Sequence, residues 1–267
     1  MHRMTVGGNR AHVVVSEVAK EFETGAAEPF VALDNIDLTI DQGEFVLLLG
    51  PSGCGKSTLL RLIAVLDAPT RGDIQVSGDR ITAGFDRIGM VFQQPTLLPW
   101  LSIFENVVYP ARVRSRRLAQ EKRDEALRLL EMVGLSRVAD QPPSSLSGGM
   151  QQRAAICRSL ILDPEILVMD EPFSALDAMT REELQFELLR IHADSGKTIV
   201  FVTHSIPEAV LMSSKIVVMA TSPGRIAETL ETGMPYPRTL DTLRLDRARQ
   251  LDNRIRELIY GRDRGQP

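Results

Sequence analysis

A glycine-rich segment carries the residues best suited to bind phosphate. Residues 50–58 read GPSGCGKST, which fits the pattern G-x-x-x-x-G-K-[ST]. Glycines let successive backbone N–H groups converge on one phosphate, and the N-terminus of a following helix adds partial positive charge. Lys56 would bring a full charge to the β- and γ-phosphates, and the Ser57 hydroxyl is a candidate Mg²⁺ ligand. The expected nucleotide-binding residues are Gly50, Pro51, Ser52, Gly53, Cys54, Gly55, Lys56, Ser57 and Thr58.

Two neighbouring carboxylates, Asp170 and Glu171, end the apolar run 166–170. At the C-terminal end of a parallel strand, Asp170 could hold Mg²⁺ through water. Glu171 could orient and deprotonate the attacking water as a general base. An isolated pair of this kind is more often just exposed to solvent, but the phosphate loop upstream favours catalysis. The two motifs predict a nucleoside triphosphatase and leave kinases, GTPases, helicases and motors open.

A second anion site is predicted at Ser147, Gly148 and Gly149. A hydroxyl and two glycine N–H groups here precede an apolar helical pattern, whose dipole would point at a negative ligand. The phosphate loop would already hold the nucleotide of its own chain. The second site could therefore bind that phosphate only when a second molecule presents it.

Short apolar runs alternate with helical patterns, which predicts an α/β fold with a mainly parallel sheet. Residues 12–40 alternate apolar and polar side chains and predict an antiparallel β edge subdomain. The pattern at 118–133 predicts a helix closed by Gly134, within an inserted helical subdomain. Buried strands are expected at 45–50, 88–92, 166–170, 199–203 and 216–220. Apolar side chains predict one final helix with Leu240, Leu243, Leu251, Ile255 and Leu258.

Composition excludes several classes of protein. The chain has 31 Lys and Arg against 35 Asp and Glu, a formal charge of −4, which argues against nucleic acid as the main partner. The basic run Arg112, Arg114, Arg116 and Arg117 is interpreted as a solvated surface. Two cysteines do not make a disulfide scaffold and suit a reducing compartment. No secretion signal is expected, nor any apolar run near the ~20 residues of a membrane span.

With LSGGMQQR at 146–153 just ahead of the carboxylate pair, residues 12–230 resemble the ATP-binding cassette (ABC) ATPases. The resemblance implies a P-loop NTPase core of the ABC ATPase fold, with ATP and Mg²⁺ as ligands. Gln93 matches the Q-loop glutamine, which contacts Mg²⁺ or the lytic water. His204 matches the switch histidine near the γ-phosphate, and Asp177 the D-loop aspartate that reaches across a dimer. Phe22 is the candidate for stacking on adenine, with Phe30 as the alternative.

The same resemblance implies partners. Two copies would sandwich two ATP molecules, close on binding and reopen on hydrolysis. Segments 92–100, 170–177, 202–209 and 222–226 resemble the nitrate/sulfonate/taurine group of importers. Permease subunits, and indirectly a solute-binding protein, are then implied, with the chain peripheral on the cytoplasmic face of the inner membrane. A soluble ABC switch in assembly or repair is the alternative.

Four smaller expectations complete the sequence interpretation. Residues 12–235 are expected to form the ABC ATPase domain, with a helical subdomain at about 94–155 and a C-terminal helical extension at 236–267. Trp100 either packs within the helical subdomain or contacts the permease. Ser205 and Glu208 are expected to form a capping box. Leu66 is expected to continue the apolar face of the helix after the phosphate loop.

Overall fold

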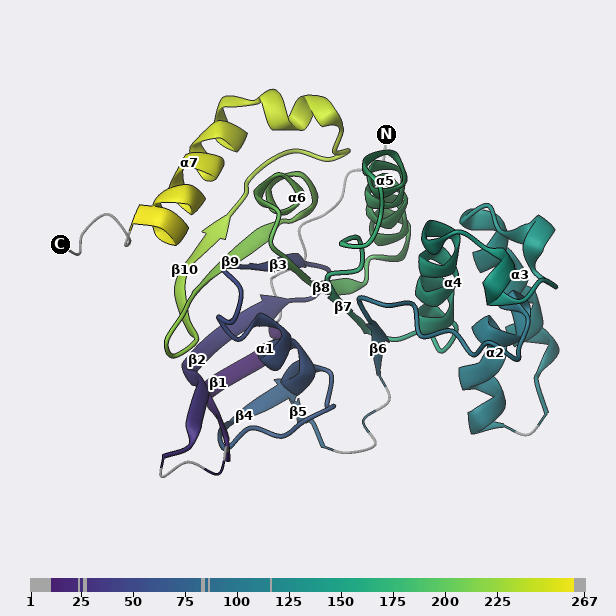
Figure 1. The fold of residues 1–267 in the computed structure, drawn as a ribbon, viewed down its shortest axis with the longest axis horizontal. Helices are drawn as coiled ribbons and strands as arrows, with labels where there is room; N and C mark the ends of the chain where they lie inside the picture. The colour runs from purple at the N-terminus through teal and green to yellow at the C-terminus, as the bar shows by residue number, and fades with distance from the viewer. Residues whose placement is uncertain are drawn as a thin grey trace. The chain divides into compact units, whose positions relative to one another are not determined.

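A computed structural model describes residues 11–23, 25, 28–82, 85, 87–115 and 117–261 (Figure 1). The chain divides into two compact units. The first unit contains residues 1–85 and 196–267, and the second unit contains residues 86–195. Each unit has its own strands and helices.

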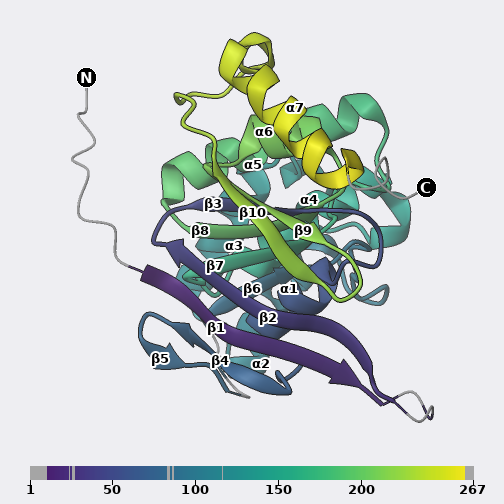
Figure 2. The same ribbon diagram turned by 90° about the vertical axis from the view of Figure 1, so that its left-hand side faces the viewer.

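The first sheet of the first unit is antiparallel. Its strands follow the order β2 (Phe30–Asp41), β1 (Ala11–Phe22), β4 (Arg71–Val76) and β5 (Asp79–Arg80). Figure 2 shows β1 and β2 side by side as long twisted strands. The antiparallel edge subdomain is thus confirmed. The sequence analysis did not detect β4 and β5, because they bury only Ile74 and Val76 and so show little apolar pattern.

The second set of strands in the first unit is mainly parallel. Strand β3 (Phe45–Leu49) runs parallel to β8 (Thr198–Thr203) and to β9 (Lys215–Ala220), and β10 (Arg225–Glu231) joins β9 antiparallel. Every side chain of β3 and β8 is buried. Burial on both faces explains why these segments are continuously apolar instead of alternating. The strands expected here are confirmed to within one residue at each end.

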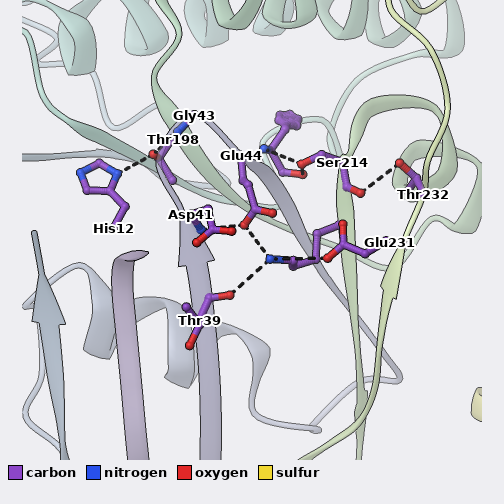
Figure 3. Close-up of polar contacts among 11 residues, drawn as sticks. His12, Thr39, Asp41, Gly43, Glu44, Thr198, Ser214, Glu231 and Thr232 are labelled. Atoms are coloured by element: carbon purple, nitrogen blue, oxygen red, sulfur yellow. Dashed lines mark hydrogen bonds and ion pairs between the residues drawn. The ribbon is translucent and has the colours of Figure 1, made fainter. Parts of the chain in front are cut away.

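Polar side chains tie the beginnings of these strands together (Figure 3). A hydrogen bond of 2.6 Å joins His12 Nδ1 of β1 to Thr198 Oγ1 of β8, and the backbone N–H of Gly43 donates to the same hydroxyl. Lys215 Nζ lies 2.7 Å from Glu44 Oε2. Both His12 and Lys215 are buried. The ends of the strands opposite the phosphate loop are therefore held by a polar network.

The helices of the first unit are α1 (Lys56–Ile63), α6 (Ile206–Met212), the 3₁₀ turn η3 (Leu240–Arg244) and α7 (Asp246–Tyr260). Two expectations were wrong. Helix α1 ends before Leu66, which is exposed. The segment expected to form one final helix instead forms η3 and α7, because Leu245 between them has extended backbone angles. Leu240 and Leu243 lie in η3, whereas Leu251 and Ile255 form the buried face of α7.

The second unit pairs β6 (Ile88–Val91) with β7 (Ile166–Asp170) in parallel. Its helices are α2 (Ile103–Arg114), α3 (Gln120–Met132), α4 (Gly148–Leu160) and α5 (Ala178–Ser195), with 3₁₀ turns η1 (Ser136–Val138) and η2 (Pro143–Ser145). Helix α3 confirms the expected helix, and Gly134 follows it with φ +72°. Helix α2 was missed because Pro110 interrupts its pattern, although Ser102 and Glu105 form a capping box at its start.

The basic run lies at the end of α2 and just beyond it. Arg114 and Arg117 are exposed. Arg112 Nη1 lies 3.6 Å from Glu105 Oε1. Arg116 lies outside the described residues. These positions agree with a solvated surface. Within the described ranges, no helix combines the length and the apolar character needed to cross a bilayer.

Candidate functional site

The phosphate loop, residues 50–58, connects β3 to α1. Gly55 is the N-cap of α1 and has the left-handed φ of +89°, which glycine adopts without strain. A Cβ at Gly55 would lie 2.4 Å from Leu33 Cδ2. Gly55 has no side chain that could cap the first turn of α1. The start of a helix concentrates backbone N–H groups and partial positive charge, which suits an anion.

Lys56 is buried, with 6% of its surface exposed, and its ammonium group bends back over the loop. Lys56 Nζ donates to Gly50 O at 2.8 Å and to Pro51 O at 2.9 Å. The carbonyl groups of the loop thus fix the position of the charge. Ser57, the next residue, is exposed, and Thr58 is half-buried.

Cys54 fills the inside of the loop. Its thiol is fully buried, with Sγ 3.7 Å from Lys56 Nζ, and burial raises the pKa of this thiol. Cys54 is therefore protonated at neutral pH and adds no charge beside Lys56. Its role in the loop is packing.

Gly224, in the turn between β9 and β10, supports the phosphate loop. A Cβ at Gly224 would lie 2.5 Å from Cys54 O and 2.6 Å from Ala32 O. The Gly224 N–H donates to Ala32 O, and the Asp34 N–H donates to Gly224 O. The sequence analysis missed this contact, because a Ser-Pro-Gly turn does not reveal what it packs against.

We expect Gly224→Ala to weaken ATP binding. The added methyl group would press on the backbone of the phosphate loop, and overpacking of this kind costs about 1–3 kcal/mol. The dissociation constant for ATP and the melting temperature measure the effect. Gly261→Ala is the matched control, because a Cβ at Gly261 meets no atom within 4 Å. Unchanged ATP affinity in Gly224→Ala would contradict the support role.

His204 is exposed and directly follows β8. The expected capping box behind it is wrong in one half. Ser205 Oγ does accept from the Glu208 N–H at 3.4 Å, but the Glu208 carboxylate accepts instead from Thr203 Oγ1 at 2.5 Å. Thr203 Oγ1 in turn accepts from the Ser205 N–H at 3.0 Å. Both neighbours of His204 are thereby fixed to the first turn of α6.

The two candidate aromatic residues, Phe22 and Phe30, face each other across β1 and β2. Their exposed fractions are 39% and 57%. Lys20 Nζ lies 5.0 Å from the centre of the Phe22 ring. Phe30 is two residues from Ala32, whose carbonyl would be 3.0 Å from a Cβ at Gly55. Both rings are exposed, so either could stack on a base.

In the second unit, β7 delivers Asp170 and Glu171 to the end of the strand. Glu171 has φ +43°, a conformation that is uncommon for a residue with a side chain and that often marks a functional position. Gln93 Nε2 donates to Ser174 Oγ at 3.0 Å, and Ser174 Oγ donates to Glu171 O at 3.0 Å. Ser174 thus links Gln93 to the backbone of Glu171, a contact that the sequence pattern did not indicate.

The signature residues begin α4. Ser147 is the N-cap, and its Oγ accepts from the Met150 N–H at 3.3 Å. A Cβ at Gly148 would meet nothing within 4 Å, whereas a Cβ at Gly149 would lie 2.3 Å from Thr180 Cγ2. Ser147 and Gly148 are exposed, and Gly149 is buried. The two glycines therefore differ: Gly148 can face a ligand, and Gly149 lets α4 approach α5.

Asp177 caps α5. Its carboxylate accepts from the backbone N–H groups of Met179 and Thr180, both at 3.1 Å, and from Thr180 Oγ1 at 2.7 Å. The hydrogen bonds from Thr180 hold the pKa of Asp177 below its usual range. Asp177 is exposed and ionised at neutral pH. All three hydrogen bonds described here are those of a residue that caps the start of a helix.

Helix α4 also holds the segment on both sides of Gln93. Gln152 Nε2 donates to Phe92 O at 3.2 Å, and the Arg158 guanidinium donates to Pro95 O at 2.9 Å and Thr96 O at 2.8 Å. The sequence analysis did not identify these side chains. They attach the Q-loop backbone to the signature helix within this unit.

The described residues distribute the expected site over both units. The first unit carries the phosphate loop, the aromatic pair and His204, and the pairing of Leu49 with Thr203 sets His204 beside the start of the loop. The second unit brings Gln93 and Ser174 to the backbone of Glu171, which follows Asp170 directly, and it separately carries the signature residues and Asp177. Among described residues, no cluster of three or more His, Cys, Asp or Glu side chains could hold a metal ion. The expected Mg²⁺ donors Ser57, Asp170 and Gln93 contribute oxygen atoms, which Mg²⁺ prefers.

Comparison with known proteins gives consistent matches. Residues 33–174 match the protein-family model described as ABC transporter. The chain is 49% identical over 209 residues to an uncharacterized ABC transporter ATP-binding protein of Methanocaldococcus jannaschii, covering 78% of this chain and 77% of that protein. It is 42% identical over 229 residues to the aliphatic sulfonates import ATP-binding protein SsuB of Bacillus cereus, covering 85% and 88%.

Two further matches are a bicarbonate transport protein and a solved structure. The chain is 42% identical over 256 residues to the bicarbonate transport ATP-binding protein CmpD of Synechocystis, covering 94% of this chain and 90% of that protein. Among solved structures, a dimeric ATP-binding cassette in a post-hydrolysis state with ADP and Pi matches with a TM-score of 0.73. That cassette is 37% identical, and the match covers 82% of this chain and 98% of that one.

Proposed function

This chain belongs to the ABC transporter family, and from that premise we propose that it is the ATP-binding subunit that energises import of a small solute through a separate permease. The observation that carries the proposal is the phosphate loop, in which a glycine begins α1 and hydrogen bonds from Lys56 Nζ to Gly50 O and Pro51 O hold the ammonium group over the loop. The family and the solved cassette with ADP and Pi support hydrolysis of ATP as the reaction.

We propose the following roles in hydrolysis. Glu171 is the general base that takes a proton from the attacking water, and Gln93 helps to place that water. His204 hydrogen-bonds the γ-phosphate. Bound Mg²⁺ would neutralise developing charge on the phosphates, with the Ser57 hydroxyl, Asp170 and Gln93 as its protein partners. The backbone of residues 50–58 holds the β-phosphate, and Phe22 or Phe30 stacks on adenine.

The partner of the signature residues is a second copy of this chain. Ser147 and Gly148 are exposed at the start of a 13-residue helix, so they can face a phosphate held by another molecule. Asp177, exposed at the start of α5, would contact the same second copy. The dimeric cassette among the solved structures supports this arrangement.

We expect Ser147→Arg to abolish hydrolysis and leave the affinity of the monomer for ATP unchanged. A guanidinium at this exposed position would occupy the space that the second molecule's phosphate needs, while the phosphate loop stays intact. Single-turnover ATPase assays and ATP titrations measure the two effects. Ser144→Arg, also exposed but in η2, is the control. Normal turnover in Ser147→Arg would exclude a composite site.

The permease would contact the second unit. A groove of about 360 Å³ in that unit is lined mainly by apolar side chains, including Met90, Phe92, Leu98 and Tyr109. Trp100 follows the same segment and is 75% exposed, which favours partner contact over packing. Attachment to the permease would place the chain on the cytoplasmic face of the membrane.

The transported solute is proposed to be a small oxyanion. Relatives named for aliphatic sulfonates and for bicarbonate support this class, together with the nitrate/sulfonate/taurine-type segments in the sequence. A solute-binding protein would deliver it. Residues 12–235 are proposed as the ATPase domain, with the helical subdomain at 94–155 and the extension at 236–267.

Co-purification tests the transport proposal. The chain, carrying an affinity tag, is extracted from membranes in mild detergent, and bound proteins are identified by mass spectrometry. A multi-span membrane protein is the expected partner. Recovery with soluble assembly or repair proteins alone would instead support the non-transport ABC switch.

A further inference from the structure

The helix that follows His204 is fixed at both ends by side chains. At its first turn, Thr203, Ser205 and Glu208 are joined by the hydrogen bonds described above. At its last turn, the contacts come from the C-terminal extension. Figures 1 and 2 both show α7 beside α6, and Leu251 and Ile255 of α7 are buried.

Arg238 makes the main polar contact at the last turn of α6. Its side chain is only 5% exposed, and Nη2 donates to Ser213 O at 3.1 Å and to Thr232 Oγ1 at 3.3 Å. Its guanidinium carbon lies 4.4 Å from the centre of the Tyr236 ring. Tyr236 OH donates to Met212 O at 3.5 Å. Arg238 and Tyr236 together bind the carbonyl groups that end the helix.

The charge of Arg238 is compensated without a carboxylate. Within the described ranges the polar partners of Arg238 are Ser213 O and Thr232 Oγ1, neither of them a carboxylate, and its Nε and Nη1 are buried without hydrogen-bond partners. A buried guanidinium without an acidic partner is costly. The Ser213 carbonyl at the end of α6, the Thr232 hydroxyl and the Tyr236 ring offset part of that cost. The cost of burying the Arg238 guanidinium therefore depends on the position of the Ser213 carbonyl at the end of α6.

The segment just before the extension is anchored to the strands through Thr232 (Figure 3). The Thr232 N–H donates to Ser214 O at 2.9 Å, and the Ser214 N–H donates to Phe45 O at 2.8 Å. Lys215 Nζ lies 2.7 Å from Glu44 Oε2. Thr232 is six residues before Arg238, so Arg238 reaches α6 from a chain attached to the start of β3.

We propose that Arg238 is a positioning residue for His204, an inference that rests on the role proposed above for His204. Helix α6 has seven residues and is about 10 Å long at ~1.5 Å per residue. Because it is a short hydrogen-bonded helix, a shift at one end moves the other end with it. Arg238 binds the C-terminal end of this helix, and His204 directly precedes Ser205, the N-cap at its other end. The C-terminal extension thereby sets the place of a side chain that acts on the γ-phosphate.

The test uses the full chain with Arg238→Met, which keeps the bulk of the side chain and removes its charge. The turnover number kcat is expected to fall about 10-fold, within the ~100-fold that a misplacement of 1 Å can cost. The dissociation constant for ATP should stay unchanged, because the phosphate loop is not altered. Arg238→Lys should restore part of kcat. Arg247→Met is the matched control. Arg247 also donates to backbone carbonyl groups, but these are Glu231 O and Thr232 O at the end of β10, and neither belongs to α6.

A double-mutant cycle with His204→Ala separates positioning from general stability. If Arg238 acts through His204, Arg238→Met has no further effect on kcat once His204 is absent. An equal fold-loss in both backgrounds overturns the proposal. A normal kcat for His204→Ala refutes the premise for His204 itself, which is a different result. Should Arg238→Met not fold, Tyr236→Leu removes the stacking partner, and the same cycle applies to it.

Discussion

Glu171→Gln is expected to lose ATP hydrolysis and keep ATP binding. The amide has the size and shape of the carboxylate, so the strained backbone at φ +43° is undisturbed, but it cannot accept a proton from water. Loss of a general base costs about 10²–10⁴-fold in rate. Because the product state is not reached, the variant should accumulate as a dimer with ATP bound.

Steady-state ATPase assays and size-exclusion chromatography with ATP measure both parts of this prediction. Glu182→Gln is the matched control, an exposed carboxylate in α5 that makes no hydrogen bond in the described structure. Turnover close to that of the unaltered chain would exclude Glu171 as the base. Loss of ATP binding would show instead that the Glu171 carboxylate is needed to maintain the structure of the nucleotide-binding site.

Lys56→Ala is the second substitution with a large expected effect, and its effect falls on binding. Charge-assisted hydrogen bonds contribute about 1.5–3 kcal/mol, which corresponds to a rise of about 10- to 100-fold in the dissociation constant for ATP. The change also leaves Gly50 O and Pro51 O without their donor. Titration with ATP, followed by calorimetry, measures the loss.

Lys122→Ala is the control for Lys56→Ala. Lys122 Nζ likewise donates to a backbone carbonyl, that of Ile161 at 2.8 Å, but it belongs to the second unit. Its removal should leave ATP affinity unchanged. Equal affinity in Lys56→Ala and the unaltered chain would remove the phosphate loop from the proposed function, whatever the outcome for Glu171.

Local sequence determined the elements and the main motifs. The runs at β3 and β8 are apolar at every position because both faces of these strands are buried, and this pattern is visible without a structure. The phosphate loop follows from the spacing of its glycines and Lys56, since neighbours in sequence alone build that loop. Helix α2 could also have been found, because the Ser102–Glu105 capping box is a local signal.

Contacts between distant segments were decided only by the tertiary structure. Gly224 supports the phosphate loop through Cys54 O, and Ser174 joins Gln93 to Glu171. Even locally, the Glu208 carboxylate accepts from Thr203 Oγ1 in place of the Ser205 N–H that a capping box would use. Arg238 binds the end of α6, 25 residues away in sequence. Sequence spacing fixes which groups are neighbours along the chain, whereas packing selects the partner each buried polar group finds, and that choice depends on the whole fold.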